Sequence, residues 1–386
     1  MNVMAGFAEY FDDLDDPRMA SKTHHPLLRV LMITVLGVLC GCESWVDLAI
    51  FAKAKHPFLA TFLDLPHGPP RKDTFRRVFE ALEPAAFRKC FLDWIGDLVG
   101  TLAGKHLAID GKTLRAALAH RDVLPLHLVH AWVVDNRALF AQVAGWGKGQ
   151  ELAALPDLLR LLDVRGATIT IDALGCQREI AQQVLDPKGD YILAVKDNPP
   201  TLHAEIRSHL DAVCKAQDPT ALTPHARVEE HGHGRHEVRE VWVSDDVASC
   251  PIASEWPKVQ CLIRVERTRT KGDTTEQSTH DFIGSTKGLG ALAALSFIRN
   301  HWGVENGLHW TLDVAMREDL SRIHDEHGAQ NFALVRRIAL NALKRDKKLK
   351  HGIRAKQKNC GWDHEYLLSI LQLMNPPDPD SVVKVG

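Results

Sequence analysis

The chain has 386 residues, 45% of them hydrophobic and 25% charged, a composition that excludes disorder, collagen and coiled coil as overall classes. At roughly 150 residues per domain, this length predicts two to three domains with cores of their own. The 47 Lys and Arg nearly balance the 49 Asp and Glu, so the net charge of -2 does not mark a nucleic-acid binder. Any contact with phosphates therefore requires a local basic patch.

Neither the cysteines nor the apolar segments indicate export or membrane insertion. The eight cysteines are spread along the chain without the paired spacing of a zinc site, which is typical of reduced thiols. Residues 30–42 form an apolar run that is too short to span a bilayer and that follows acidic residues rather than a basic leader. We expect a buried helix there, and a cytoplasmic protein without membrane contact.

Residues 1–100 have the apolar periodicity of helices separated by turn signals, which predicts an all-α N-terminal module. Four basic residues near the expected start of one helix suit phosphate groups, although a solvated helix face explains each of them equally well: Arg71, Lys72, Arg76 and Arg77.

From about residue 105 the pattern changes to strands and then alternates. The expected strands are 106–110, 126–134, 138–143, 167–172 and 191–196, with helices at 151–162 and 177–185. Three antiparallel strands followed by helix, strand, helix and strand is the element order of the RNase H-like fold. We therefore assign residues 101–200 to the first part of an α/β core, a mixed five-stranded sheet with flanking helices.

The remaining part of the chain, residues 201–386, is divided by pattern into three parts. Residues 201–290 contain strand-like segments separated by polar turns, and we interpret them as a β-rich insertion that lies off the main sheet. Residues 291–345 return to helices that close the core, and residues 346–386 read as a basic helical tail.

Three acidic residues are candidates for a metal site. Asp110 and Asp172 each end a predicted apolar strand, and strands in this order place both at one sheet edge, where open α/β sheets build their sites. Mg²⁺ requires oxygen ligands of this kind. A third acid is offered by residues 299–313, where helical spacing puts Trp302, Glu305, His309 and either Leu312 or Asp313 on one face. Asp313 competes with Glu305 for that role.

Four motifs, at residues 108–115, 170–177, 233–239 and 301–306, resemble those of DDE transposases of the ISAs type, which include the H-repeat-associated proteins of bacteria. The similarity extends to residues 16–18, 25–27, 73–77 and 331–344, so it covers nearly the whole chain. This resemblance implies that Asp110, Asp172 and Glu305 are the catalytic acids.

The sequence departs from related transposases at three places. Residues 145–151 keep only Lys148 and Glu151 of a usual Lys-Ser-Asn-Glu run, and residues 197–199 replace a usual Gly-Asn-Gln. Leu312 stands where related insertion-sequence transposases carry a Lys. A phosphate contact at that position would pass to Arg299, His309 or Lys196.

Given a DNA substrate, several basic and aromatic residues become candidate DNA contacts. Lys112, Arg115 and Lys196 are possible backbone clamps, although each alone is more often a surface charge. Trp302 and Trp310 could stack on an unpaired base or pack in the core. Residues 344–358 carry eight Lys or Arg against the single acid Asp346, and this local patch includes Lys347, Lys348 and Lys350.

The resemblance implies a transposase that binds double-stranded DNA at the ends of an insertion sequence and at a target, as a homodimer when DNA-bound. Its three carboxylates would hold two Mg²⁺ ions, with Mn²⁺ able to substitute, for in-line attack on a phosphodiester. The N-terminal module would bind DNA itself or be a module associated with DNA binding. Two alternatives are a nuclease of the same fold that acts on branched or damaged DNA, and a non-catalytic DNA-binding regulator derived from a transposase.

One further cluster resembles a metal site. His225, His231, His233 and His236 lie close together in sequence, but their spacing matches no zinc pattern, and Gly232 and Gly234 favour a loop that leads into a strand.

Overall fold

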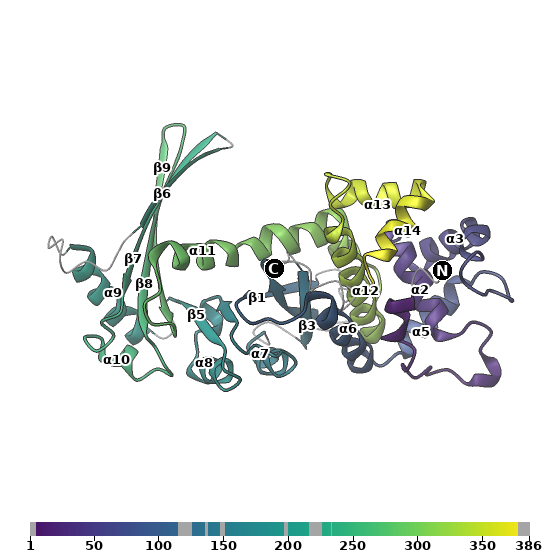
Figure 1. Ribbon diagram of the computed structural model, residues 1–386, viewed down its shortest axis with the longest axis horizontal. Coiled ribbons are helices and arrows are strands. Elements are labelled where there is room, and N and C mark those ends of the chain that lie inside the picture. Colours follow the sequence, from purple (N-terminus) through teal and green to yellow (C-terminus); the bar gives the residue numbers. More distant parts are fainter. Residues whose placement is uncertain are drawn as a thin grey trace, which may run out of the picture.

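A single mixed sheet of nine strands runs through the molecule, with helices along its face and a helical body at one end (Figure 1). The computed structural model describes residues 5–114, 126–135, 138–146, 151–196, 200–215, 226–232 and 234–376. The strand order is β3-β2-β1-β4-β5-β9-β8-β7-β6. The strands are β1 (His106–Leu114), β2 (Leu126–Val133), β3 (Ala138–Trp146), β4 (Thr168–Ile171), β5 (Asp190–Val195), β6 (Ala226–Gly232), β7 (Arg235–Ser244), β8 (Cys261–Lys271) and β9 (Thr274–Gly284).

The first five strands follow the predicted element order. β1 pairs antiparallel with β2 and β2 with β3, whereas β1, β4 and β5 are parallel neighbours. Helices α7 (Glu151–Arg160) and α8 (Arg178–Leu185) make the crossovers between the parallel strands. The short apolar β4 and β5 are largely buried, as expected for parallel strands covered on both faces.

The expectation that residues 201–290 lie off the main sheet is wrong. β9 pairs antiparallel with β5, from Ile192 opposite Gly284 to Val195 opposite Asp281, and β8, β7 and β6 continue the same sheet. The sheet therefore has nine strands rather than five. The physical reason is that β5 would otherwise be an open edge with unpaired backbone groups, which β9 covers.

Strands β6–β9, which we call the arm, project beyond the sheet that β1–β5 form (Figure 1). Their outer halves are polar on both faces, so apolar alternation gives little sign of the length of these strands. Helices α9 (Pro200–Lys215) and α10 (Pro251–Ser254) pack against each other, and α9 also contacts β7, β8 and β9. A separate small apolar core joins the base of the arm to α11 (Ala291–His301).

Helix α11 crosses the sheet face from the arm toward the helical end (Figure 1). It continues into two π-helical turns, Glu305–His309 and Thr311–Ala315, and a 3-10 turn, Glu318–Leu320. The chain then enters the long, largely buried α12 (Glu326–Arg345).

The two ends of the chain form one helical body around α12. The N-terminal helices are α1 (Ala5–Glu9), α2 (Leu27–Leu39), α3 (Trp45–Ala54), α4 (His56–Leu59), α5 (Lys72–Ala81) and α6 (Pro84–Val99), with a 3-10 turn at Ala20–Lys22, and the C-terminal helices are α13 (Ile353–Trp362) and α14 (His364–Gln372). Buried Asn331 of α12 donates to the carbonyls of Phe79 (3.0 Å) and Leu82 (2.8 Å). Gln357 of α13 donates to the Val38 carbonyl of α2 (3.1 Å).

The apolar run at residues 30–42 is the buried α2 and its C-terminal turn, which confirms the predicted buried helix. Within the described ranges, no helix combines the length and the apolar character that crossing a membrane requires.

Candidate active site

The register of two parallel strands brings Asp110 and Asp172 together. Ile109 of β1 is paired with Ile171 of β4, so the two aspartates are the next residues at the same sheet edge. Neighbouring strands lie about 4.8 Å apart. The Asp172 carboxylate accepts the Leu174 backbone N–H (3.1 Å), which fixes the turn that follows β4. Asp172 directly follows β4, whereas Asp110 lies within β1, which continues beyond the predicted end at residue 110 to Leu114 because β2 pairs with it along this length. Backbone geometry therefore holds the two carboxylates at neighbouring positions of adjacent strands.

Glu305 joins these aspartates from the helix that crosses the sheet face. Asp110, Asp172 and Glu305 line one cavity of about 340 Å³, which we call the acid cavity. Glu305 begins the first π-helical turn, where the Trp310 N–H donates to the Glu305 carbonyl. Single π-turns inside helices occur frequently at functional sites. The other polar or aromatic side chains that line the cavity include Lys196, His203, His280, Asp281, His301 and Trp302.

The competing candidate Asp313 has a different partner. The Lys112 ammonium lies 2.5 Å from Asp313 Oδ1 and 3.0 Å from Asp319 Oδ1, and its side chain is only 5% exposed. Burial raises the pKa of Asp313, although Lys112 opposes this shift. Asp313 does not line the acid cavity. Lys112 is a buried structural cation rather than the DNA clamp that we expected, and Arg115 lies outside the described residues.

A buried polar chain leads from Asp110 into the core. His309 Nδ1 lies 3.5 Å from Asp110 Oδ2, and His309 Nε2 lies 3.3 Å from His130 Nδ1. Arg337 Nη2 donates to His130 Nε2 (3.1 Å), and Arg337 is paired with Glu318. Because a guanidinium can only donate, His130 Nε2 must accept, which leaves Nδ1–H to donate to His309 and the His309 Nδ1–H to point at Asp110.

Both imidazoles in this chain are held neutral. Burial, reinforced by Lys112 and Arg337, lowers the pKa of His309 to about 4. Burial and Arg337 also lower the pKa of His130 well below its usual value. His309 therefore orients a carboxylate from inside the protein instead of presenting a charge to DNA, which corrects its expected role. His130, Arg337 and Glu318 were not foreseen, and the only sequence signal is the pair of arginines at 336–337 within an apolar helix.

A second buried chain lies beneath Asp172. His106 Nε2 is 2.8 Å from Thr170 Oγ1, and Thr170 Oγ1 is 2.9 Å from His301 Nδ1. Burial lowers the pKa of both histidines, that of His106 to about 3. His301 lines the acid cavity, so this chain supports the cavity wall next to Asp172.

A larger hollow of about 590 Å³ adjoins the acid cavity on the side of the arm. Five arginines line it, and we call it the arginine groove: Arg235, Arg239, Arg267, Arg269 and Arg299. Trp302, Glu305 and His280 border both hollows. Trp302 is 50% exposed and Trp310 is 58% exposed, so core packing does not explain either side chain.

Only some side chains of the predicted C-terminal basic patch are exposed and able to contact DNA. Lys347, Lys348 and Lys350 are exposed. Lys344 donates to the Gly307 carbonyl (2.6 Å), and the buried Lys356 donates to two backbone carbonyls of its own region. Part of the positive charge therefore stabilises the helical body.

Position 312 cannot supply the phosphate contact that related transposases make with a Lys. Leu312 is fully buried in the main core. Of the three substitutes considered, Lys196 lines the acid cavity, whereas Arg299 donates through Nη2 to both oxygens of Glu230 (2.7 and 3.0 Å).

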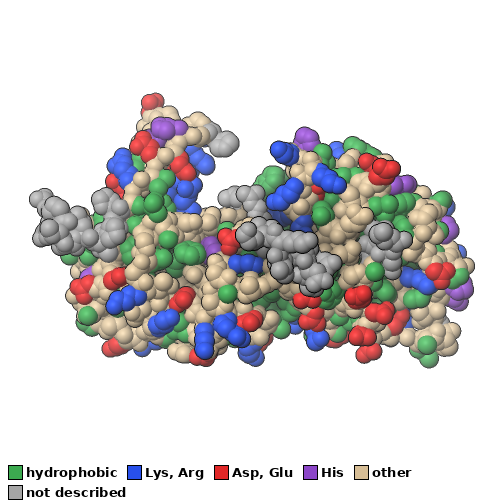
Figure 2. Space-filling view, viewed as in Figure 1, with side chains coloured by type: hydrophobic (Ala, Val, Ile, Leu, Met, Phe, Trp, Pro, Cys, Tyr) green, Lys and Arg blue, Asp and Glu red, His purple; other side chains and the backbone are tan. Residues whose placement is uncertain are grey.

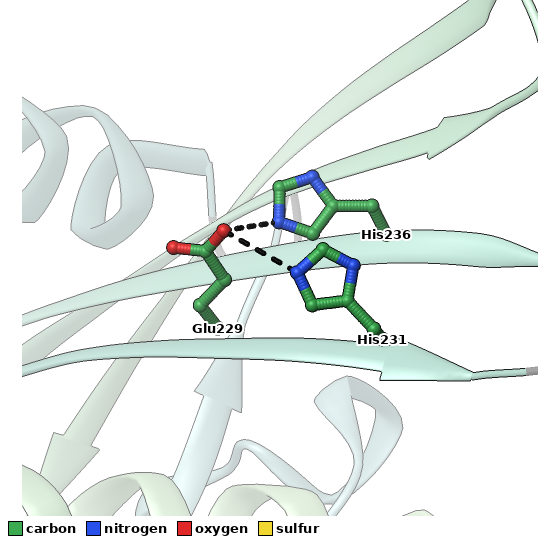
Figure 3. Close-up of side chains that lie close together, drawn as sticks. All are labelled: Glu229, His231 and His236. Atoms are coloured by element: carbon green, nitrogen blue, oxygen red, sulfur yellow. Dashed lines mark hydrogen bonds and ion pairs between the residues drawn. The ribbon is translucent and has the colours of Figure 1, made fainter.

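The histidine-rich segment forms a strand hairpin rather than a loop leading into one strand. His231 of β6 is paired with His236 of β7, and their rings stack at 4.2 Å (Figure 3). Glu229 Oε1 lies 2.6 Å from His236 Nε2 and 3.7 Å from His231 Nε2. This exposed cluster could hold a transition metal. It does not line the acid cavity, and His225 and His233 are outside the described residues.

Comparison with known proteins identifies the family of this chain. Residues 102–342 match the family described as Transposase DDE domain, and residues 8–95 match the DDE_Tnp_1-associated family. The chain is 34% identical over 372 residues to "Putative protein YbfL" of Escherichia coli K12, covering 94% of this chain and 97% of that protein. It is 33% identical over 369 residues to "H repeat-associated putative transposase YhhI" of the same strain, again covering 94% and 97%. "Putative transposase YncI" of E. coli O157:H7 is 32% identical over 369 residues, covering 94% and 93%.

Proposed function

This chain belongs to the DDE transposase family, and from that premise we propose that it cleaves and rejoins DNA strands at Asp110, Asp172 and Glu305. The observation that carries the proposal is that these three acids, from β1, the turn after β4 and the π-helical turn after α11, line one cavity. The strand order β3-β2-β1-β4-β5 supports an RNase H-like core, with the arm as an extension of its sheet.

The donor set of the acid cavity fits hard divalent cations, because all three acids offer carboxylate oxygens. Asp110, Asp172 and Glu305 would hold two Mg²⁺ or Mn²⁺ ions, which supply Lewis acidity toward the attacking and leaving oxygens of a phosphodiester. His309 orients the Asp110 carboxylate through its Nδ1–H. The chain of His106, Thr170 and His301 supports the wall next to Asp172.

The side chains around the acid cavity suit a DNA strand. Lys196 lies in the cavity and can contact a phosphate beside the reacting one. Trp302 at the rim is half exposed and offers a stacking surface for an unpaired base. Figure 2 shows Lys and Arg side chains on both flanks of a notch between the arm and the C-terminal helices. Lys347, Lys348 and Lys350 are exposed in the segment between α12 and α13.

The complete reaction needs double-stranded element ends and a target, and we propose that a homodimer assembles on this DNA in the cytoplasm. All eight cysteines are free thiols, which fits a reducing compartment. The three acids favour an active enzyme over a regulator derived from a transposase, since a regulator would not need them. A joined product distinguishes the transposase from a nuclease that only cuts.

The proposal is tested by Mg²⁺-dependent strand cleavage and joining on duplex DNA that carries the element ends. Glu305→Gln keeps the shape of the side chain but removes its charge, so cleavage should fall at least about 100-fold while DNA binding survives. The matched control is Asp313→Asn, an acid-to-amide change on the same helix outside the acid cavity, and this variant should cleave.

Two results would contradict the assignment. Cleavage by Glu305→Gln together with loss of activity in Asp313→Asn would move the third ligand to the next helical turn. Normal cleavage by both variants would reject the three-acid site.

A further inference from the structure

The arm has one face that is rich in arginine. Side chains alternate along a strand, so Arg235, Glu237 and Arg239 of β7 share a face. In the register of β7 with β8, Glu237 is opposite Arg269 and Arg239 is opposite Arg267. These cross-strand pairs line the arginine groove together with Arg299 of α11.

The opposite face of the same strands has a different charge. Glu240 of β7 is opposite Glu266 of β8, and Arg227 of β6 is paired with Glu240 (3.0 Å). Helix α9 covers the base of this face, where its Asp211 is paired with Arg264. Four of the six arginines in the described strands of the arm therefore lie on the face that adjoins the acid cavity, and the other two, Arg227 and Arg264, are paired with carboxylates on the opposite face.

Carboxylates at and beside the groove hold most of its arginines in place, but these carboxylates are fewer than the arginines. Buried Glu237 accepts from Arg239 and lies 3.7 Å from Arg235 and 3.8 Å from Arg269. Glu230 binds Arg239 and Arg299. Such pairing fixes the planar guanidinium groups in position while each keeps free donors.

Arg267 is the exception in the groove. Among the residues that the structure describes, Arg267 forms no ion pair, and its buried Nε has no hydrogen-bond partner. Arg267 lies among four other cations and is paired with none of the described carboxylates. This arrangement raises the free energy of the folded state unless an anion binds there. Its field extends to the acid cavity, because Arg267 and Lys196 add to the burial that lowers the pKa of His280.

The groove and the acid cavity adjoin each other and share lining residues. Trp302 and Glu305 border both hollows, so a strand with its reacting phosphate at Glu305 passes directly into the groove. In Figure 1 the arm rises beside α11, and in Figure 2 basic side chains lie along the flank of the arm that faces the notch.

We infer that the arginine groove binds successive phosphates of the DNA strand that enters the acid cavity, with Arg267 and Arg269 as direct contacts. This inference rests on the proposed function and adds the path of the strand. Arginine suits the task because its guanidinium contacts phosphate oxygens in a bidentate manner.

The test is the salt dependence of binding to a fluorescently labelled random-sequence DNA duplex. Replacing both Arg267 and Arg269 by Gln should reduce the slope of log K against log salt by about 1.8, since each lost phosphate contact removes about 0.9. The Arg267→Lys, Arg269→Lys protein keeps both charges and should keep the slope. The matched control is Arg227→Gln, which removes an arginine from the opposite face of the arm and should also keep the slope.

The single variant Arg267→Gln is a control for structural damage, because it breaks no ion pair among the described residues. It should still reduce the slope by about 0.9. An unchanged slope in Arg267→Gln and in the double Gln variant, with wild-type melting, would overturn the inference. Failure of the wild-type protein to bind the duplex would instead reject the proposed function, so the two failures are distinguishable.

Discussion

The buried pair of Glu318 and Arg337 allows a quantitative test of how the site is supported. Glu318 is 1% exposed and Arg337 0% exposed, and both Glu318 oxygens bind the Arg337 guanidinium. Glu318→Gln keeps the shape but leaves the permanently charged Arg337 buried without its counter-ion, and it also removes the carboxylate that lies 3.8 Å from the buried Arg336. Breaking a buried pair in this way costs about 3–5 kcal/mol of the free energy of unfolding.

Urea unfolding followed by circular dichroism measures this loss. Glu318→Leu combined with Arg337→Met removes the closer pair but leaves the buried Arg336 without the Glu318 carboxylate, so it should recover only part of the stability. The same double variant deprives His130 of the donor that sets its tautomer, so cleavage should remain impaired although stability is partly restored. A Glu318→Gln protein within about 1 kcal/mol of wild type would refute the reasoning, because no uncompensated buried charge could then be present.

Two further predictions concern acid stability and DNA binding. Burial lowers the pKa of His106 from 6.5 to about 3, so its contribution to stability is complete above pH 6.5 and is lost as the pH falls toward 3. The free energy of unfolding should fall by about 2–3 kcal/mol from pH 7 to pH 4.5 through this residue, and His106→Gln should abolish that part of the pH dependence. Urea unfolding at several pH values measures it, and an equal dependence of the unfolding free energy on pH in the variant and the wild type would contradict the prediction. Reversal of Lys347, Lys348 and Lys350 to Glu should weaken binding to all duplexes and reduce the slope of log K against log salt by up to about 2.7. The control is reversal of the exposed Arg160 and Arg165, which precede β4 at the other sheet edge, and this change should leave the slope as it is. An unchanged slope in the triple variant would show that these three lysines lie on a solvated surface that does not contact DNA.

The parts of the site that were predictable are those set by local sequence. Asp110 follows the apolar first half of β1 and Asp172 follows the apolar β4, and the order of strands and helices is enough to make those strands parallel neighbours. Glu305 could be placed on a helix but not distinguished from Asp313 by helical spacing. The π-turns that follow it, and the Lys112 that binds Asp313, come from tertiary packing.

The parts that were not predictable depend on partners far apart in the chain. Periodicity reports whether a strand has a buried face, but it does not report which strand it pairs with, so the pairing of β9 with β5 was missed. The outer arm gave no apolar alternation because arginines occupy the face that a core would fill. His130 and Arg337 meet 207 positions apart, and no local pattern marks such a contact.

Metal binding tests the central claim, that three carboxylates share one cation site, most directly. Mn²⁺ bound to the protein–DNA complex can be counted by electron paramagnetic resonance in a His231→Ala, His236→Ala background, which removes the exposed cluster on the arm. The account predicts two ions per chain, loss of at least one in Asp110→Asn or Glu305→Gln, and retention of both in Asp313→Asn. Undiminished Mn²⁺ binding in Asp110→Asn and Glu305→Gln would contradict the account.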